Sequence, residues 1–234
     1  MPVRAVLFDL GGTLIGNNLN TFEIFHKILE SAGISVSVQK VEETFIRVKE
    51  GEGVIFDQLL GKIPSIELYS LWDSMVLRAL GIEDDGALAR TIDSQWIAAS
   101  SPFAYHDVAP FLAFLREKGI KTGIISNGYQ EEIQRILEIV GLDPQGFDVI
   151  VGGDTIKRAK PDPCVFQYAV ETLGITPNEA MYVGNLMEKD YTAAERAGLI
   201  PFLVIRSPRG DLLEGVRTVA TLTALQKVVE DHLI

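Results

Sequence analysis

Several residue types and patterns are scarce in this sequence, and each shortage excludes a class of protein. There is one cysteine, Cys164, so no disulfide can form within the chain, and we expect a reducing, cytoplasmic location. Only 21 Lys and Arg stand against 32 Asp and Glu, and the net charge of −11 argues against a nucleic-acid partner. No apolar run is long enough to span a bilayer, and the chain enters a predicted strand at Val3, so we expect neither a membrane segment nor a secretion signal.

The remaining composition is that of an ordinary soluble protein, with 47% hydrophobic and 23% charged residues. A length of 234 residues suits one large domain, or one domain with an insertion. The excess of acidic residues affects how the chain could bind an anion. A site that binds an anion would need a local lysine, backbone N–H groups or a metal ion to offset the overall negative field.

The first fifteen residues predict a buried strand that ends on a carboxylate. Residues 3–8 are almost continuously apolar, and Asp9, Gly11, Gly12 and Thr13 follow. In an open α/β sheet, ligands bind beyond the carboxyl ends of the strands. Asp9 is therefore placed to touch a ligand, although an aspartate here could also serve only the turn that follows.

Residues 16–98 read as consecutive helices with no convincing strand between them. Apolar residues recur at helical spacing, and we expect Gly51 and Gly53 to end the second helix. The predicted helices cover about 20–32, 37–49, 65–80 and 85–98. This segment is a predicted helical bundle.

From residue 102 the pattern alternates between strands and helices. The predicted strands are 121–125, 147–151, 180–183 and 200–205, and predicted helices lie between them and at 222–233. Such alternation is typical of a parallel sheet in a doubly wound α/β fold. We therefore predict an α/β core made of residues 1–15 and 99–234, with the helical bundle of 16–98 inserted after its first strand.

Polar side chains follow the end of each predicted core strand. Asp9 is succeeded along the chain by Ser126, Lys160, Asn185 and Asp190, and the carboxyl ends of parallel strands share one edge of a sheet. Each residue also has a structural alternative: the serine could cap a helix, the lysine could be solvated, and Asp190 could favour a helix N-terminus. Their order along the chain favours a shared site.

This arrangement resembles the haloacid dehalogenase (HAD) superfamily over essentially the whole chain. The matching segments are Asp9-Leu-Gly-Gly-Thr13, Ile-Ile-Ser126-Asn-Gly, Lys160-Pro-Asp-Pro and Gly-Asn185 with Asp190 downstream. The resemblance implies a Rossmann-like core, a helical cap, a small-molecule substrate and Mg²⁺. It implies that Asp9 is the nucleophile and that Ser126 and Lys160 are catalytic. It further implies that Gly12, Thr13, Asn127 and Gly128 bind substrate phosphate, and that Asp9, Gly11, Asn185 and Asp190 bind the metal.

Two positions depart from the pattern of this superfamily. Its phosphatases carry an acid two residues after the nucleophile, which protonates the leaving alcohol, and here that position is Gly11. General acid–base catalysis of this kind contributes ~10²–10⁴-fold in rate. The usual metal-binding aspartate of the fourth motif is Asn185, whose amide oxygen can bind Mg²⁺ without adding charge.

Three functions remain open from the sequence. The first is hydrolysis of a small phosphorylated metabolite with Mg²⁺, which the Lys160-Pro and Gly-Asn185 segments favour. Such a hydrolase would act on a good leaving group, for example in an acyl phosphate, or would take an acid from the cap. The second is 2-haloacid dehalogenation, because a departing halide needs no proton. The third is a non-catalytic descendant that binds a ligand or a protein. The chain is expected to be a monomer or a homodimer.

Overall fold

The computed structural model describes residues 2–206 and 215–232, which form two compact units. One unit joins the residues up to Gly16 to those from Ala104 onward, and the other comprises Asn17–Phe103. The helical unit thus extends five residues beyond the predicted boundary at 98, because its last helix runs to Ser100 and a short strand follows.

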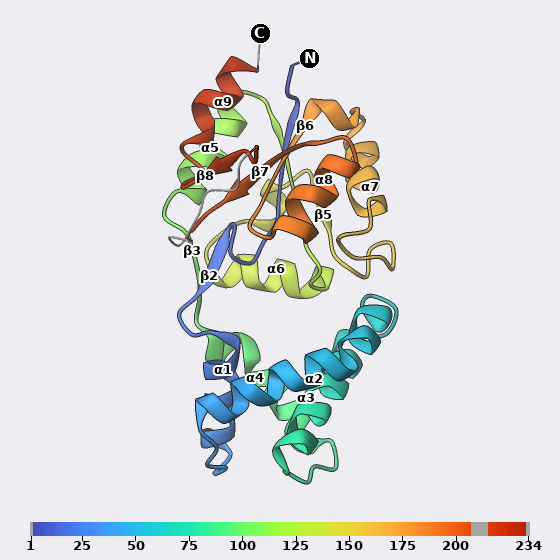
Figure 1. The fold of residues 1–234 in the computed structure, drawn as a ribbon. Coiled ribbons are helices and arrows are strands. Elements are labelled where there is room, and N and C mark those ends of the chain that lie inside the picture. Colours follow the sequence, from blue (N-terminus) through green and yellow to red (C-terminus); the bar gives the residue numbers. More distant parts are fainter. Residues whose placement is uncertain (1, 207–214, 233–234) are drawn as a thin grey trace. The chain divides into compact units, whose positions relative to one another are not determined.

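The first unit is built on a six-stranded sheet in the order β5-β4-β1-β6-β7-β8, and every described pairing in it is parallel (Figure 1). The central strand β1 pairs with β4 on one side and β6 on the other, with Phe8 opposite both Ile124 and Val183. The strands are β1 (Ala5–Phe8), β4 (Lys121–Ile125), β5 (Val149–Val151), β6 (Ala180–Gly184), β7 (Ile200–Val204) and β8 (Thr218–Val219).

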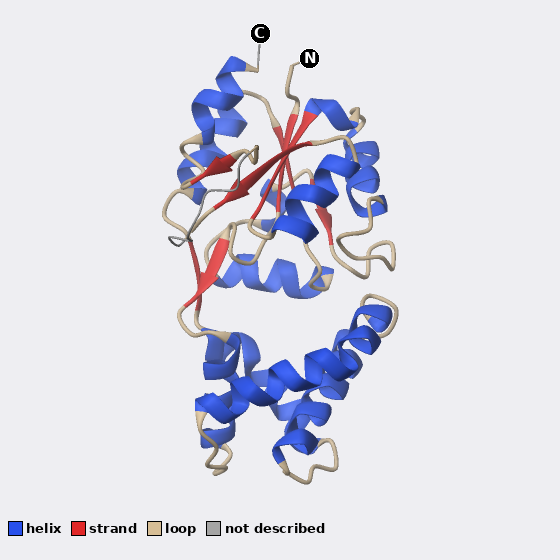
Figure 2. Ribbon diagram, in the orientation of Figure 1, coloured by secondary structure: helices blue, strands red, loops and turns tan. Residues whose placement is uncertain are grey.

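Helices cover both faces of this sheet (Figure 2). Side chains alternate along β1, so Val6 and Phe8 pack with one set of helices while Ala5 and Leu7 pack with the other. The first set is α5 (Val108–Glu117), α6 (Gln130–Ile139) and α9 (Leu225–Asp231), and the second is α7 (Cys164–Leu173) and α8 (Ala193–Arg196). Three short turns complete the unit: η1 (Pro144–Gly146), η2 (Pro177–Glu179) and the π-helix η3 (Met187–Thr192). The predicted doubly wound α/β fold is confirmed.

The second unit is a helical bundle of α1 (Thr21–Ser31), α2 (Val38–Leu59), α3 (Ser65–Leu80) and α4 (Ala87–Ser100). The predicted end of the second helix was wrong, because α2 continues through Gly51 and Gly53 for 22 residues in all. A glycine inside a helix costs only about 1 kcal/mol. The ring of Phe56, beyond both glycines, lies 5.4 Å from that of Trp72 on α3, and such aromatic packing offsets the cost.

A two-stranded sheet formed by β2 (Ile15–Asn17) and β3 (Pro102–Ala104) was not predicted from the sequence. Both chain connections between the units pass through these strands, and the unit boundary falls inside each of them. At three residues each, they are too short to give a period-2 pattern. Strand β8 was also missed, and the predicted tail helix is shorter than expected, with Leu233 outside the described residues. Along the described chain, no helix combines the length and apolar character needed to cross a membrane.

Candidate active site

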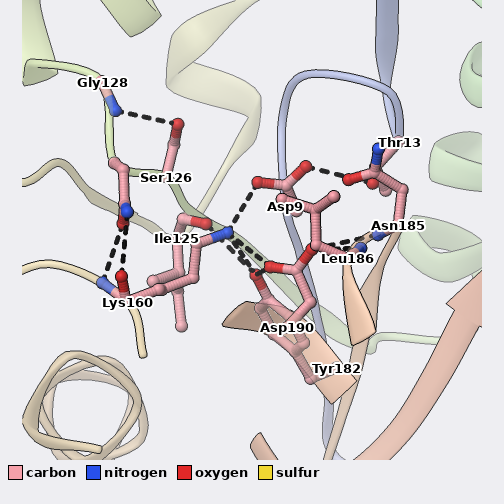
Figure 3. Close-up of polar contacts among 11 residues, drawn as sticks. Asp9, Thr13, Ile125, Ser126, Gly128, Lys160, Tyr182, Asn185, Leu186 and Asp190 are labelled. Atoms are coloured by element: carbon pink, nitrogen blue, oxygen red, sulfur yellow. Dashed lines mark hydrogen bonds and ion pairs between the residues drawn. The ribbon is translucent and has the colours of Figure 1, made fainter. Parts of the chain in front are cut away.

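The strand register brings the predicted site residues to one edge of the sheet. Because β1, β4 and β6 are aligned at Phe8, the residues that follow them emerge together. Asp9 follows β1 directly, Ser126 follows β4, and Asn185 follows β6. Lys160 comes from the loop between β5 and α7, and its side chain reaches back to the same place (Figure 3).

A buried ion cluster forms the centre of the site. The Lys160 ammonium donates to Asp9 Oδ1 at 2.6 Å and to Asp190 Oδ1 at 2.7 Å (Figure 3). The three side chains are only 4%, 11% and 1% exposed, respectively. Contacts of this length are typical of charge-assisted hydrogen bonds between an ammonium and carboxylate oxygens.

Burial and charge act on the cluster in opposite directions. Burial raises the pKa of Asp9, and the nearby charge of Asp190 adds to this, while Lys160 opposes it only in part. Burial by itself lowers the pKa of Lys160, but the two carboxylates outweigh it and hold that pKa above its usual value. The lysine therefore stays protonated at neutral pH and offsets the charge of Asp9.

Tyr182, in β6, belongs to the cluster and was not predicted. Its hydroxyl accepts from Lys160 Nζ at 2.9 Å and lies 3.1 Å from Asp190 Oδ1 and 3.3 Å from the carbonyl oxygen of Ile125. Burial, followed by the charges of Asp190 and Asp9, raises the pKa of Tyr182 well above its usual value, so the hydroxyl keeps its proton. A tyrosine in a fully buried strand needs a partner for its hydroxyl, which is the signal that could have identified it.

Two glycines allow the loops at the strand ends to approach closely. Gly12 has a φ of +79°, and a Cβ there would lie 2.2 Å from Asn185 Nδ2. A Cβ at Gly184 would lie 2.3 Å from the Cβ of Asp190. Beside them, Thr13 is fully buried, and its hydroxyl donates to Asp9 Oδ2 at 3.1 Å, which orients the carboxylate.

The residues after β4 make local contacts of their own. The side-chain amide of Asn127 donates to the Lys160 carbonyl at 2.9 Å and accepts from the Lys160 N–H at 2.8 Å. Both ends of this side-chain amide therefore hold the loop that carries Lys160. Ser126 Oγ accepts from the N–H of Gly128 at 3.2 Å, a turn that presents the serine at the edge of the sheet.

The geometry separates the predicted metal ligands into two groups. Asp190 accepts at Oδ1 from Lys160 and Tyr182, and at Oδ2 from the N–H groups of Asn185 and Leu186 at 3.1 and 2.9 Å. These contacts occupy the acceptor positions of Asp190 in this structure and tie it to Lys160. In contrast, Asn185 Oδ1 is buried and has no hydrogen-bond partner among the described residues, as expected of an oxygen that binds a cation.

A cation site here would be weakly charged. Within the described residues, no group of three or more His, Cys, Asp or Glu side chains is placed to hold a metal. Of the ligands that the sequence predicts, Asp9 and Asn185 follow directly after the neighbouring strands β1 and β6. Mg²⁺ accepts such sets because it keeps several of its waters.

A second buried ion pair supports the loop of the nucleophile and was also missed. The Arg206 guanidinium donates to both oxygens of Asp107, at 2.9 and 2.7 Å, and to the carbonyl oxygen of Thr13 at 2.6 Å. It also stacks on the ring of Tyr105, 4.1 Å from the centroid. Asp107 in turn accepts from the N–H of Leu222 at 2.6 Å. Residues far apart in the sequence make this pair, so spacing alone could not reveal it.

Comparison with known proteins agrees with this geometry. Residues 3–198 match the family described as haloacid dehalogenase-like hydrolase. The chain is 34% identical to glyceraldehyde 3-phosphate phosphatase of Methanopyrus kandleri, over 90% of this chain and 87% of that protein. It is 29% identical to (S)-2-haloacid dehalogenase 1 of a Pseudomonas species, over 79% and 77% of the two chains. A HAD phosphatase structure from Thermococcus onnurineus has the same fold, with a TM-score of 0.67, 24% identity, and coverage of 99% and 100%. The chain therefore belongs to the haloacid dehalogenase-like hydrolase family.

Proposed function

We propose that this hydrolase cleaves small phosphorylated molecules, with Asp9 as the nucleophile. The observation that carries the proposal is the 2.6 Å contact between Lys160 Nζ and Asp9 Oδ1 inside a buried cluster. A phosphoryl group brings negative charge toward a carboxylate, so the attack needs a fixed cation at that place. Lys160 meets this requirement, and Asp190 with Tyr182 keeps its ammonium in position.

In the proposed reaction, an Asp9 oxygen attacks phosphorus and forms an aspartyl phosphate, and the leaving group takes the electron pair of the broken P–O bond. Water then attacks the same phosphorus, which restores the Asp9 carboxylate and releases inorganic phosphate. Thr13 holds the carboxylate in the orientation for attack. Ser126 and loop N–H groups at the strand ends are proposed to bind the phosphoryl oxygens.

Mg²⁺ is proposed as the cofactor, held by Asp9, the Gly11 carbonyl and Asn185. The buried and unpartnered Asn185 Oδ1 supports this assignment. When bound, the ion would add positive charge beside the phosphoryl oxygens. Asp190 is left out of the metal set because its oxygens already accept four hydrogen bonds.

The similarity to a phosphatase at 34% identity supports phosphate chemistry. We further propose that the helical unit is the cap implied by the sequence resemblance, and that the substrate is a small metabolite. Both remain proposals, because the substrate contacts of such a unit do not follow from the packing of its own helices.

The test is phosphate release from an aryl phosphate with and without Mg²⁺, for the wild type, Asp9→Asn and Asp231→Asn. Asp231→Asn is the control, because Asp231 is an exposed aspartate at the end of α9. Its neighbour His232 accepts a hydrogen bond at its carbonyl oxygen from the N–H of Val3, just before β1. We expect turnover that requires Mg²⁺, disappears in Asp9→Asn and persists in Asp231→Asn. Equal turnover in all three proteins would exclude Asp9 as the nucleophile.

Dehalogenation of 2-haloacids is a second candidate. Gly11 favours it, because a halide leaves without a proton, and so does the 29% identity to a haloacid dehalogenase. Halide release from 2-haloacids by the same three proteins tests this alternative. If neither phosphate nor halide is released, the chain is a binding protein on a hydrolase scaffold.

A further inference from the structure

The N–H bonds of the Lys160 ammonium are already used in hydrogen bonds within the buried cluster. An ammonium has three N–H bonds, and Lys160 Nζ makes three contacts: Asp9 Oδ1 at 2.6 Å, Asp190 Oδ1 at 2.7 Å and the Tyr182 oxygen at 2.9 Å. The lysine is therefore a poor proton donor toward a leaving group.

The hydroxyl protons near Asp9 are committed in the same way. Thr13 donates its proton to Asp9 Oδ2 at 3.1 Å. The single proton of Tyr182 has two acceptors within reach, Asp190 Oδ1 at 3.1 Å and the Ile125 carbonyl at 3.3 Å. Neither hydroxyl can protonate a leaving group without breaking a contact that holds the cluster together.

The position beside the nucleophile where an acid would fit is open. Gly11 is exposed, its φ lies outside the left-handed region, and no atom lies within 4 Å of where its Cβ would be. Asp190 is the other carboxyl of the cluster, and it accepts four hydrogen bonds. Within the described core, the side chains in contact with Asp9 or Lys160 thus include no free acid.

We infer that the substrates are phosphoryl compounds whose leaving group departs as a stable anion, such as acyl phosphates and esters of acidic phenols. This inference rests on the proposed phosphatase function. The Asp9 oxygen bonds to phosphorus, the P–O bond to the leaving group breaks, and the leaving oxygen keeps the electron pair without receiving a proton. A water oxygen then bonds to the phosphorus of the aspartyl phosphate, the P–O bond to Asp9 breaks and restores the carboxylate, and both protons of the water stay on the released phosphate. Alkyl phosphates, whose alkoxides are strong bases, are poor substrates, which would distinguish this chain from the glyceraldehyde 3-phosphate phosphatase to which it is similar.

The experiment measures kcat/KM for a series of aryl phosphates of increasing phenol pKa, together with acetyl phosphate and a simple alkyl phosphate, all with Mg²⁺. The ratio kcat/KM reports the steps up to the transfer of the phosphoryl group to Asp9. Slow hydrolysis of the intermediate therefore does not mask the slope, that is, the dependence of kcat/KM on the pKa of the phenol. We expect kcat/KM to fall about tenfold for each unit of phenol pKa, the steep dependence of an unassisted departure.

Two variants at the open position sharpen the test. Gly11→Asp supplies a carboxylic acid where space exists, and Gly11→Asn supplies a side chain of the same size without an acid. We expect Gly11→Asp to flatten the slope and to raise kcat/KM for the poorest leaving groups by ~10²-fold or more. Gly11→Asn should keep the steep slope of the wild type.

The outcomes separate the inference from the function on which it rests. A shallow slope in the wild type, with alkyl phosphates cleaved as readily as aryl ones, would overturn the inference and leave the phosphatase function standing, because an acid would then reach the site from elsewhere. Absence of turnover on every phosphate, acetyl phosphate included, would overturn the proposed function itself. Equal slopes in Gly11→Asp and Gly11→Asn would also contradict the inference.

Discussion

Replacing Lys160 with methionine should destabilise the core unit strongly, and by an amount that depends on pH. The change leaves Asp9 and Asp190 buried without their common cation. Removing one partner of a buried ion pair costs ~3–5 kcal/mol. For a protein of this size, such a loss lowers the melting temperature by roughly 6–20 °C.

The pH dependence of this loss follows from Asp9. Burial raises the pKa of this carboxyl, and Lys160 opposes the rise, so the variant has a still higher Asp9 pKa. A carboxyl whose pKa is higher in the folded state binds its proton more tightly there. The contribution of Asp9 to stability is therefore most favourable below the usual Asp pKa. It is lost as the pH rises through the pKa that Asp9 has in the folded protein. The deficit of Lys160→Met should be larger at pH 8 than at pH 5.

Urea unfolding can assign this loss of stability to the core unit, because two spectroscopic signals follow different units of the protein. Both tryptophans, Trp72 and Trp96, lie in the helical unit, so far-UV circular dichroism follows both units while tryptophan emission follows only the helical one. Lys118→Met is the control, because Lys118 is 40% exposed and pairs with Glu230 at 3.5 Å, where a surface ion pair is worth less than about 1 kcal/mol. A Lys160→Met deficit equal to that of Lys118→Met, or unchanged between pH 5 and 8, would refute the reasoning.

Three further predictions concern other parts of the chain. Burial raises the pKa of Asp73 well above its usual value, so Asp73→Asn should stabilise the helical unit at pH 8. This gain in stability should vanish as the pH falls below the usual Asp pKa. A loss of stability at pH 8, followed by tryptophan emission, would contradict the prediction. Arg206→Met should cost the core unit ~3–5 kcal/mol in urea unfolding, because Asp107 is left buried and unpaired; an unchanged midpoint would show that the pair contributes nothing. Asn185→Asp should tighten Mg²⁺ binding about tenfold by calorimetry, since an added charge strengthens a cation site, and unaltered affinity would remove position 185 from the metal set.

Local patterns sufficed to predict the fold. Apolar periodicity located most helices and the long strands, because each pattern lies within one element and reflects one buried face. The edge of the sheet that carries Asp9 and Asn185 followed from the parallel topology. The errors arose where tertiary packing determines the ends of an element. In α2, the contact of Phe56 with Trp72 stabilises helical structure beyond two glycines.

The site was predicted only in part, because sequence identifies which residues gather but not how each lone pair is used. The sequence did not predict that Asp190 accepts four hydrogen bonds at the centre of the site. It also did not predict that the Asn127 side chain holds the Lys160 loop. Tyr182 and the Arg206 pair were invisible because their partners lie on other elements.

The place of β1 in the sheet also sets the order in which a newly made chain can assemble. This strand is synthesised before its two neighbours, β4 and β6, with Ala5 opposite Lys121 and Ala180. Between them, the helical unit is one continuous stretch whose contacts close locally. At ~5–20 residues per second, β1 waits on the order of ten seconds for its first partner to emerge from the ribosome. Any premature stop before β6 would leave the apolar strand that carries Asp9 with an unpaired edge, open to pairing with other chains.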